Sequence, residues 1–380
     1  MRLFQAPGRA NLIGDHIDYM GGLVLPMAID RGTWLWVEGR DDSLIRGSSV
    51  NFPESGTIDV DINDSAYDTA RGWTNYLVAM AYALRKRGAV IPHGFDVRVR
   101  GDIPNGAGLS SSASIELAFG VALNNWFDLG FTPTELAQAG QIAENEFIGV
   151  SSGIMDQLII ANGRRGYALA MDCQTLDLSP VPMPADDVII VADSGKRRGL
   201  VESAYNERRA AAEKAERELG GPRLVDIAPE DLGTALARLE PALRGPARHV
   251  ATEQHRVLEA VAALQAGDDV RMGQLMRQSH ESLRDDYRVT GPELDALAAA
   301  AWEAPGCLGA RMTGAGFGGC TVNLVRAEAA EEFADFVGPR YTEATGLDPR
   351  FFVVRPDAGA REITESAELN ANPAPAWEQA

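Results

Sequence analysis

The sequence lacks an excess of positive charge. Its 380 residues carry 35 Lys and Arg against 54 Asp and Glu, a formal net charge of −19. Nucleic acid and anionic membrane surfaces both bind basic patches, so this balance argues against either as a partner. An anionic ligand would have to be held locally, by backbone N–H groups, a metal ion or a few well-placed cations.

Cysteines and long apolar runs are also scarce. The three cysteines, Cys173, Cys307 and Cys320, lie far apart and form no C-x-x-C motif, which predicts a reducing compartment and excludes a zinc site of the usual spacing. No stretch of about 18 uncharged apolar residues is present, and the first residues lack the apolar segment of a secretory signal. We therefore expect a cytoplasmic protein without a membrane span.

The length of the chain suggests two domains, because domains usually hold about 100–200 residues. A pattern of strands and helices runs through the first half and restarts near residue 186. We expect one domain over residues 1–185 and a second over 186–362. Residues 363–380 are polar and rich in Pro and Ala, which predicts a flexible tail.

Local patterns predict several elements. Phe95, Val97 and Val99 alternate with polar residues, as in a half-buried strand. Thr132, Pro133 and Glu135 form a capping box with proline at the first helical position, so a helix is expected from there to residue 147. Another helix is expected over 202–219. The expected strands cover residues 33–40, 57–62, 94–103, 187–194 and 350–356.

Residues 101–114, GDIPNGAGLSSSAS, join an expected strand to an expected helix. Its glycines would let the backbone approach a ligand, and N–H groups at a helix start attract phosphate. A structural turn of small residues with a serine N-cap explains the same sequence, so this loop alone does not distinguish a phosphate site from a turn. It is not a Walker A loop, because no Gly-Lys-Ser/Thr follows. It is not the dinucleotide fingerprint, because Ser111 stands where the third glycine belongs.

A second glycine-rich segment covers residues 312–320, MTGAGFGGC, and runs into an expected strand. A tight hairpin or a bulge explains such a density of glycine. A backbone that lies against a ligand or another loop explains it equally well.

Three acidic residues lie in segments where both a structural and a functional role are possible. Asp156 interrupts an apolar run at 154–160, so it is expected to be buried and to need a partner. Helix capping or a buried ion pair would be structural, whereas a carboxylate directed at a substrate hydroxyl would be functional. Glu144 and Glu146 fall on the capped helix, where either a solvated face or an inward Mg²⁺ ligand is possible.

The most unusual segment is residues 8–22, GRANLIGDHIDYMGG. It gathers Arg9, Asp15, His16, Asp18 and Tyr19 among glycines. A solvated turn does not need Asn-Leu-Ile in its middle, and a buried strand does not need Asp-His-x-Asp. This cluster is a candidate binding site.

Together these segments resemble the GHMP kinase superfamily, and within it the galactokinase family. Residues 8–30 resemble the family's sugar signature, 106–114 its phosphate-binding loop, and 309–322 its third motif. GIMDQ at 153–157 resembles the segment with the catalytic aspartate. Segments 73–84, 203–209 and 279–295 also fit, so the similarity runs from about residue 5 to 358.

The resemblance implies an α+β, two-domain GHMP kinase fold. Its N-terminal domain would be of the ribosomal-protein-S5-like type and would carry the phosphate loop. Its C-terminal domain would be ferredoxin-like, and the active site would lie in the cleft between the two. The implied partners are small-molecule substrates, with no nucleic acid or membrane, and the implied state is a monomer.

The resemblance also implies roles for individual residues. Asp156 and Arg9 match catalytic residues, and Asp156 would accept the proton of the sugar's anomeric hydroxyl or orient that hydroxyl. The sugar-binding positions would be Asp15, His16, Asp18, Gly153 and Tyr205. The nucleotide-binding positions would be Trp73, Gly106, Gly108, Leu109, Ser110, Ser111, Ser112 and Ala113. Mg²⁺ would be held by Ser112 and Glu144. One departure is Asp15, which stands where the family usually has glutamate and is one methylene shorter.

The implied activity is ATP- and Mg²⁺-dependent phosphorylation of α-D-galactose at its anomeric hydroxyl. Phosphoryl transfer depends mostly on positioning and charge neutralisation, which a metal ion and loop N–H groups supply. One alternative is a sugar-1-kinase for a related hexose, suggested by Asp15. Another is a catalytically silent sugar sensor, against which the presence of Arg9, Glu144 and Asp156 argues. A GHMP kinase for mevalonate or homoserine is disfavoured by the GDHIDY segment and Tyr205.

Overall fold

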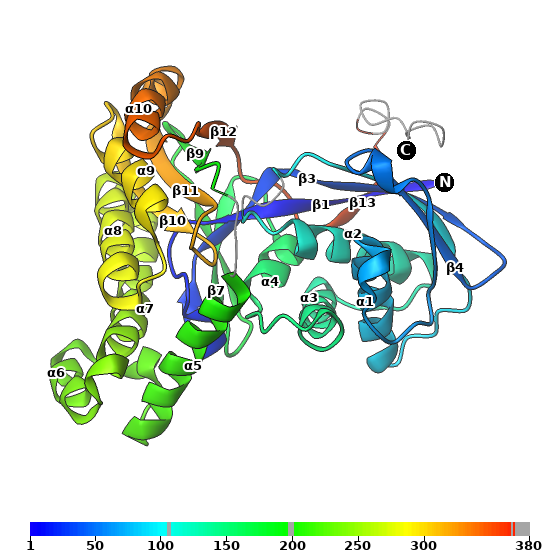
Figure 1. The fold of residues 1–380 in the computed structure, drawn as a ribbon, viewed down its shortest axis with the longest axis horizontal. Coiled ribbons are helices and arrows are strands. Elements are labelled where there is room, and N and C mark those ends of the chain that lie inside the picture. Colours follow the sequence, from blue (N-terminus) through cyan, green and yellow to red (C-terminus); the bar gives the residue numbers. More distant parts are fainter. Residues whose placement is uncertain (105–107, 197–200, 366–367, 369–380) are drawn as a thin grey trace.

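The first lobe is built on one mixed sheet (Figure 1). The structure is a computed structural model, and it describes residues 1–104, 108–196, 201–365 and 368. The strand order is β13-β1-β3-β6-β4-β5, and every neighbouring pair is antiparallel except β4 with β6. These strands are β1 (Arg2–Asn11), β3 (Pro26–Gly39), β4 (Leu44–Ser49), β5 (Ile58–Asp61), β6 (Phe95–Gly101) and β13 (Arg361–Ile363).

Four helices cover one face of this sheet. The helix α2 packs directly on β1 and β3, with α1 and α3 beside it and α4 against β1. The helices are α1 (Thr74–Lys86), α2 (Ser111–Trp126), α3 (Pro133–Ile142) and α4 (Met155–Asn162). A small antiparallel sheet of β2 (Leu23–Val24), β7 (Tyr167–Asp172) and β8 (Leu178–Pro182) follows. The first turn of α2 therefore lies over the end of β1, where the candidate cluster begins.

The second lobe is an antiparallel sheet with helices beside it (Figure 1). Its order is β10-β11-β9-β12, and α8 and α9 pack on β10. The strands are β9 (Asp187–Asp193), β10 (Cys307–Thr313), β11 (Cys320–Arg326) and β12 (Arg350–Val354). The helices are α5 (Val201–Leu219), α6 (Pro229–Arg238), α7 (Pro241–Ala266), α8 (Asp269–Ser282), α9 (Pro292–Trp302) and α10 (Ala330–Thr345). The expected two-lobed α+β architecture is confirmed.

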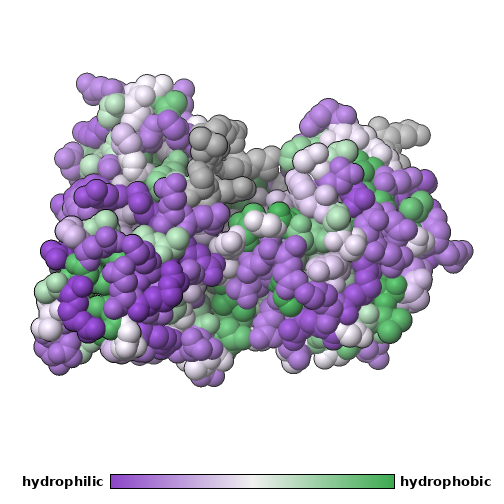
Figure 2. Space-filling model, turned by 60° about the horizontal axis from the view of Figure 1, so that its bottom comes forward, coloured by the Kyte–Doolittle hydropathy of each residue, from purple (hydrophilic) through white to green (hydrophobic). Residues whose placement is uncertain are grey.

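One buried apolar cluster connects the lobes. It contains Leu12 and Ile13 from the first lobe together with Val257 and Leu275 from α7 and α8. A second cluster fills the space between β9–β11 and helices α9 and α10. A hollow lies between the lobes in the space-filling view, with hydrophilic side chains over both flanks (Figure 2). Because the core is continuous beneath this hollow, the two lobes hold its walls in fixed relation.

Most local expectations are confirmed. Phe95, Val97 and Val99 are buried along β6, and Thr132 and Glu135 make the expected capping box at the start of α3. One expectation is wrong in detail. The capped helix, expected to run to residue 147, changes to a π-helical turn over Ala143–Ile148, a feature that often marks functional sites. The glycine-rich segment 312–320 connects β10 and β11 as a hairpin, which is one of the explanations that its sequence left open.

The strand β13 lies in another lobe than the expected domain boundaries imply. Those boundaries place residues 361 and 362 in the second domain and Ile363 in a tail, but β13 is an edge strand of the first sheet, with Leu3 opposite Ile363. Beyond it, Glu368 forms an ion pair with Arg165 at 3.1 Å, and the other tail residues after 365 lie outside the described residues. In the described part of the chain, no helix has the length and apolarity needed to cross a bilayer.

A carboxyl group is buried inside α2. Glu116 is fully buried, and neither of its side-chain oxygens has a hydrogen-bond partner among the described residues. Burial, together with nearby Glu144, raises the pKa of Glu116 well above 4.5. The folded protein therefore holds a proton at Glu116 that the unfolded chain releases as the pH rises above about 4.5.

We predict that Glu116→Gln makes the protein less sensitive to alkaline pH. A raised folded pKa means that the free energy of unfolding falls as pH rises from that of the unfolded carboxyl towards that of the folded one. One extra bound proton gives a slope of about 1.4 kcal/mol per pH unit. Urea unfolding at pH 5, 6, 7 and 8 should show a smaller fall for Glu116→Gln than for the parent. The exposed Glu146→Gln is the control, and equal slopes in all three proteins would contradict the prediction.

Candidate active site

A cavity of about 310 Å³ lies between the lobes and collects most of the expected site residues. Its lining includes segments from β1, the 14–18 loop, the start of α2, the turn before α4, helix α5 and the β10–β11 hairpin. The expected residues in its lining are Arg9, Asp15, His16, Asp18, Gly108, Ser110, Ser111, Ser112, Glu144, Gly153, Asp156 and Tyr205. Residues that are up to about 200 positions apart in the sequence are thus brought to one wall.

Arg9 joins three of these segments. Its Nε and Nη2 donate to Asp156 Oδ1 and Oδ2 at 2.8 and 2.7 Å, a bidentate ion pair. Its Nη1 donates to the carbonyl of Gly108 at 2.5 Å, and its backbone N–H donates to the carbonyl of Leu109 at 3.1 Å. Ser110 Oγ also donates to Asp156. Arg9 therefore fixes the small-residue loop and the carboxylate of Asp156 relative to each other.

The loop fits closely against β1. A Cβ atom at Gly8 would lie 2.8 Å from the carbonyl oxygen of Leu109, so only glycine permits this approach. Ser110 adopts a left-handed backbone, with φ of 63°, and places Ser111 and Ser112 in the first turn of α2. The first N–H groups of a helix have no acceptor within the helix, and Ser111 and Ser112 border the cavity, which is the arrangement that attracts an anion. Leu109 and Ala113 are buried in the core beneath, and Gly106 lies outside the described residues.

Asp18 lines the same cavity as Asp156 and is half-buried. A Cβ atom at Gly153 would lie only 1.8 Å from Asp18 Oδ2, so the backbone at 153 and this carboxylate are in direct contact. Burial raises the pKa of Asp18 to about 6, and the charge of Asp156 adds to the effect. Two neighbouring carboxyl groups thus differ in environment, since Arg9 pairs with Asp156 but not with Asp18.

His16 is buried with both ring nitrogens engaged. Its Nε2 lies 3.2 Å from the carbonyl of Ala315, and its Nδ1 lies 3.0 Å from the hydroxyl of Tyr19. Burial lowers the pKa of His16 to about 3, so the ring is neutral. The carbonyl can only accept, so Nε2 carries the hydrogen and Nδ1 accepts from Tyr19. The hydroxyl of Tyr287 lies 2.7 Å from that of Tyr19 and extends the network.

Helix α5 closes one side of the cavity with Tyr205. The ring centroid of Tyr205 lies 5.5 Å from that of His16 and 5.7 Å from that of Tyr19. Burial raises the pKa of the Tyr205 hydroxyl well above 10, so this group is a neutral donor and acceptor. An aromatic wall beside hydrogen-bonding groups suits a ligand with one apolar face and many hydroxyl groups.

Asp15 is 1% exposed and borders the cavity from below. Its Oδ1 accepts a hydrogen bond from the backbone N–H of Gly314 at 3.0 Å, and its Oδ2 forms an ion pair with Arg311 at 2.7 Å. Burial raises the pKa of Asp15, and the charge of Arg311 is the largest influence that opposes this. The glycine-rich hairpin, for which the sequence left several explanations open, thus contacts the 14–18 loop.

Ser112 and Glu144 form a pair of oxygen donors suited to Mg²⁺. Ser112 Oγ donates to Glu144 Oε1 at 2.8 Å, and Glu144 is 8% exposed. Glu146, two residues along the π-helical turn, points the other way and pairs with Lys86. Burial raises the pKa of Glu144. Within the described ranges no group of three or more His, Cys, Asp or Glu could hold a metal, so phosphate oxygens would complete this site.

Trp73 lies in a neighbouring cavity of about 140 Å³. This second cavity shares Ser111 and Ser112 with the first, and the rest of its lining combines apolar and aromatic residues such as Phe52 and Ile115 with polar ones such as Asn51. The indole Nε1 of Trp73 is buried without a hydrogen-bond partner among the described residues. The two cavities thus meet at the start of α2, as a site for phosphate between two different ligands requires.

Some residues of the site were not predicted from the sequence. Gly314 and Ala315 line the cavity, and Asn206 lies beside Tyr205 in its wall. Arg311, fully buried, was also missed. Arg311 could have been found by the argument that singled out Asp156. Each is a single charged residue in an apolar segment, and a buried charge needs a partner.

Three family models match the chain. The galactokinase galactose-binding signature matches residues 2–38, the N-terminal domain of GHMP kinases matches 75–164, and the C-terminal domain of GHMP kinases matches 260–342. The first match contains the 8–22 cluster, and the second contains the loop with Ser110–Ser112 and also Asp156.

Known proteins agree with these matches. The galactokinase of Lactiplantibacillus plantarum is 43% identical over 368 residues, 95% of each chain, and that of Bacillus subtilis is 42% identical over 369 residues, 96% of this chain and 95% of the other. The solved structure of Lactococcus lactis galactokinase complexed with galactose has a TM-score of 0.92 and 39% identity, with 95% of each chain covered. The mevalonate kinase of Methanococcus jannaschii, at 19% identity and a TM-score of 0.67 over 93% of this chain and 98% of the other, shares the fold alone. The chain belongs to the galactokinase family of GHMP kinases and is a sugar kinase.

Proposed function

We propose that this protein transfers the γ-phosphoryl group of ATP to the anomeric hydroxyl of α-D-galactose, with α-D-galactose 1-phosphate and ADP as products. The observation that carries the proposal is the bidentate pairing of Asp156 with Arg9 in the first cavity, beside the start of α2 that both cavities share. The first cavity is rich in groups that can bind hydroxyls, and the second combines the aromatic residues Phe52, Trp73 and Tyr76 with polar ones. Their meeting point is the first turn of α2, where backbone N–H groups favour phosphate.

In the proposed mechanism the sugar lies against Asp15, His16, Asp18, Gly153 and Tyr205. Carboxylates and a neutral imidazole discriminate among hydroxyl groups, because a sugar with one hydroxyl misplaced leaves a buried polar group unpaired. The Nε2–H of His16 would exchange its bond with the carbonyl of Ala315 for one with the sugar. Asp156 would orient the anomeric hydroxyl and accept its proton, while Arg9 holds the carboxylate in place.

The nucleotide would lie with its base near Trp73 and its phosphates along Gly108–Ala113. Ser112 and Glu144 would hold Mg²⁺, which on binding neutralises charge that develops on the transferred group. Loop N–H groups contribute to the same end, and the positioning of the two substrates supplies much of the remaining rate enhancement.

We also expect the protein to be a monomer in a reducing intracellular compartment.

The activity itself is tested with a panel of acceptors. ATP consumption with Mg²⁺ should show the highest kcat/KM for galactose, above glucose, galactosamine, N-acetylgalactosamine, mannose and mevalonate. A higher value for another hexose would move the substrate and leave the fold and mechanism in place. Nucleotide binding without turnover of any acceptor would favour a silent sugar sensor.

We predict that Asp156→Asn lowers kcat by about 10²–10⁴-fold, because general base catalysis contributes this much. Nucleotide affinity, measured by calorimetry, should stay within a few fold, because Asp156 does not border the cavity of Trp73. Asp96 is a matched control, since its carboxylate is also half-buried and paired with an arginine, Arg40, at 2.7 Å. Asp96→Asn should retain activity, and turnover near the parent level in Asp156→Asn would refute the assigned role.

The two glutamates of the π-helical turn provide a test of the metal site. Glu144→Gln should raise the Mg²⁺ concentration for half-maximal activity at least tenfold, because it removes the one carboxylate proposed to bind the ion. Glu146→Gln should leave it unchanged, because that side chain points to Lys86. Titrations of activity with Mg²⁺ at saturating ATP would decide, and the same Mg²⁺ requirement in both variants would count against Glu144 as a ligand.

A further inference from the structure

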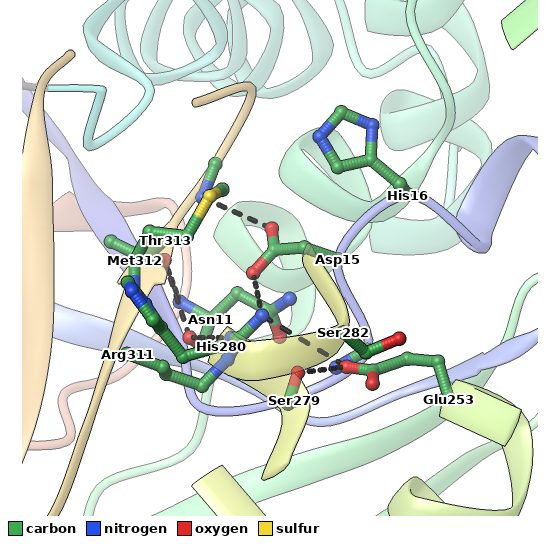
Figure 3. A network of polar contacts seen from close by, with 12 residues as sticks. Asn11, Asp15, His16, Glu253, Ser279, His280, Ser282, Arg311, Met312 and Thr313 are labelled. Atoms are coloured by element: carbon green, nitrogen blue, oxygen red, sulfur yellow. Dashed lines mark hydrogen bonds and ion pairs between the residues drawn. The ribbon is translucent and has the colours of Figure 1, made fainter. Parts of the chain in front are cut away.

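Arg311 does not line the cavity but lies next to Asp15, which does. It is on β10, it is 0% exposed, and its guanidinium stands between the carboxylates of Asp15 and Glu253 (Figure 3). Its Nη2 is 2.7 Å from Asp15 Oδ2 and 3.9 Å from Glu253 Oε1. Its Nη1 donates to the carbonyl of Asn11 at 3.1 Å. Arg311 thus contacts the sugar-side loop from the second lobe.

We propose that Arg311 is a positioning residue for sugar selectivity, which sets the direction of the Asp15 carboxylate without touching the sugar. This inference rests on the proposed function, because it assigns the selectivity to Asp15. Arg311 serves Asp15 more than Glu253, and it acts on the side chain of Asp15 and not on the backbone that carries it.

Glu253 is well partnered without Arg311. Its Oε1 accepts from the backbone N–H of Gly14 at 2.9 Å and from Ser279 Oγ at 2.5 Å, and its Oε2 accepts from Arg256 Nε at 2.7 Å. Among the influences that lower the pKa of Glu253 to about 2 against the effect of burial, the charge of Arg256 is the largest and that of Arg311 is smaller. Asp15 accepts from the N–H of Gly314, and Arg9 and the side chain of Asn11 also favour its charged form, but Arg311 is the largest of these influences. The guanidinium therefore serves Asp15 first.

The backbone of the loop is held by other groups. His249 Nε2 lies 3.1 Å from the carbonyl of Asp15, and Glu253 accepts from the N–H of Gly14. Burial lowers the pKa of His249 to about 4, so the ring is neutral and Nε2 donates. Both contacts come from α7 and remain if Arg311 is changed. The direction of the Asp15 side chain can therefore vary while its backbone stays in place.

The contact between Asp15 and Arg311 leaves capacity for a ligand. Asp15 Oδ2 lies 2.7 Å from Arg311 Nη2, and Asp15 also borders the cavity. A carboxylate oxygen accepts more than one hydrogen bond, so a hydroxyl group presented from the cavity can add one to Asp15. A residue that fixes Oδ2 thus fixes which hydroxyl group of a sugar is recognised.

The test compares two arginines that share Glu253. Arg311→Met removes the charge behind Asp15, and Arg311→Lys keeps a charge but not the planar group. Arg256→Met and Arg256→Lys are the matched controls, because Arg256 pairs with the same Glu253 and, within the described structure, forms no ion pair or hydrogen bond with Asp15. For each variant, kcat and KM are measured for galactose, for sugars that differ from it at one hydroxyl group, and for ATP.

We expect Arg311→Met to raise KM for galactose at least tenfold, to reduce the ratio of kcat/KM between galactose and its competitors, and to leave KM for ATP within twofold. Arg311→Lys should recover part of the ratio. Asp15→Asn should lower the ratio similarly, and combining it with Arg311→Met should add little, because both act on one contact. If Arg311→Met does not fold, the comparison of Arg311→Lys with Arg256→Lys decides by the same ratio.

Three results would overturn the inference. These are an unchanged ratio in the Arg311 variants, an equal loss with all sugars and ATP, and a change of the same size in the Arg256 variants. Each is read against the parent enzyme in the same panel. A parent without preference for galactose refutes the proposed function, whereas a parental preference that Arg311→Met leaves intact refutes only the role of Arg311.

Discussion

The ion pair between Arg9 and Asp156 is the interaction on which the geometry of the site depends. Arg9 is 4% exposed and holds a helix start, a loop carbonyl and the end of β1 in one place. A buried guanidinium without such partners would cost several kcal/mol, so the three segments are stable only together. The bidentate geometry also removes rotational freedom from the carboxylate, which is the kind of preorganisation that phosphoryl transfer requires.

The sugar side of the cavity follows a different rule. Asp15, His16 and Asp18 are desolvated, and their neighbours decide which is charged: Arg311 stabilises the carboxylate of Asp15, burial keeps His16 neutral, and Asp156 opposes ionisation of Asp18. Three polar groups within four residues thus differ in how their surroundings affect ionisation. A site of this kind distinguishes hydroxyl groups by position, because donors and acceptors cannot be exchanged without a cost in free energy.

Local rules account for what the sequence predicted well. The capping box at Thr132 and the alternation along β6 depend on neighbours in the chain, and both are confirmed. Non-local pairings were not accessible in this way. The pairing of β13 with β1 and the contact of Arg311 with Asp15 join segments whose sequences do not indicate a partner. The grouping of Asp156 with Arg9 was expected only through family resemblance, since 147 positions separate them. Glu144 and Glu146 could be distinguished only by the π-helical turn.

The pairing of Leu3 with Ile363 has a consequence for how the protein is made. During synthesis β1 acquires this neighbour only after some 360 further residues have been added, and the 11–15 segment acquires Arg311 nearly as late. Contacts of such long range slow folding. One edge of β1 therefore stays unpaired until β13 has been made, and an open strand edge of this kind is where a partly folded chain can pair with another.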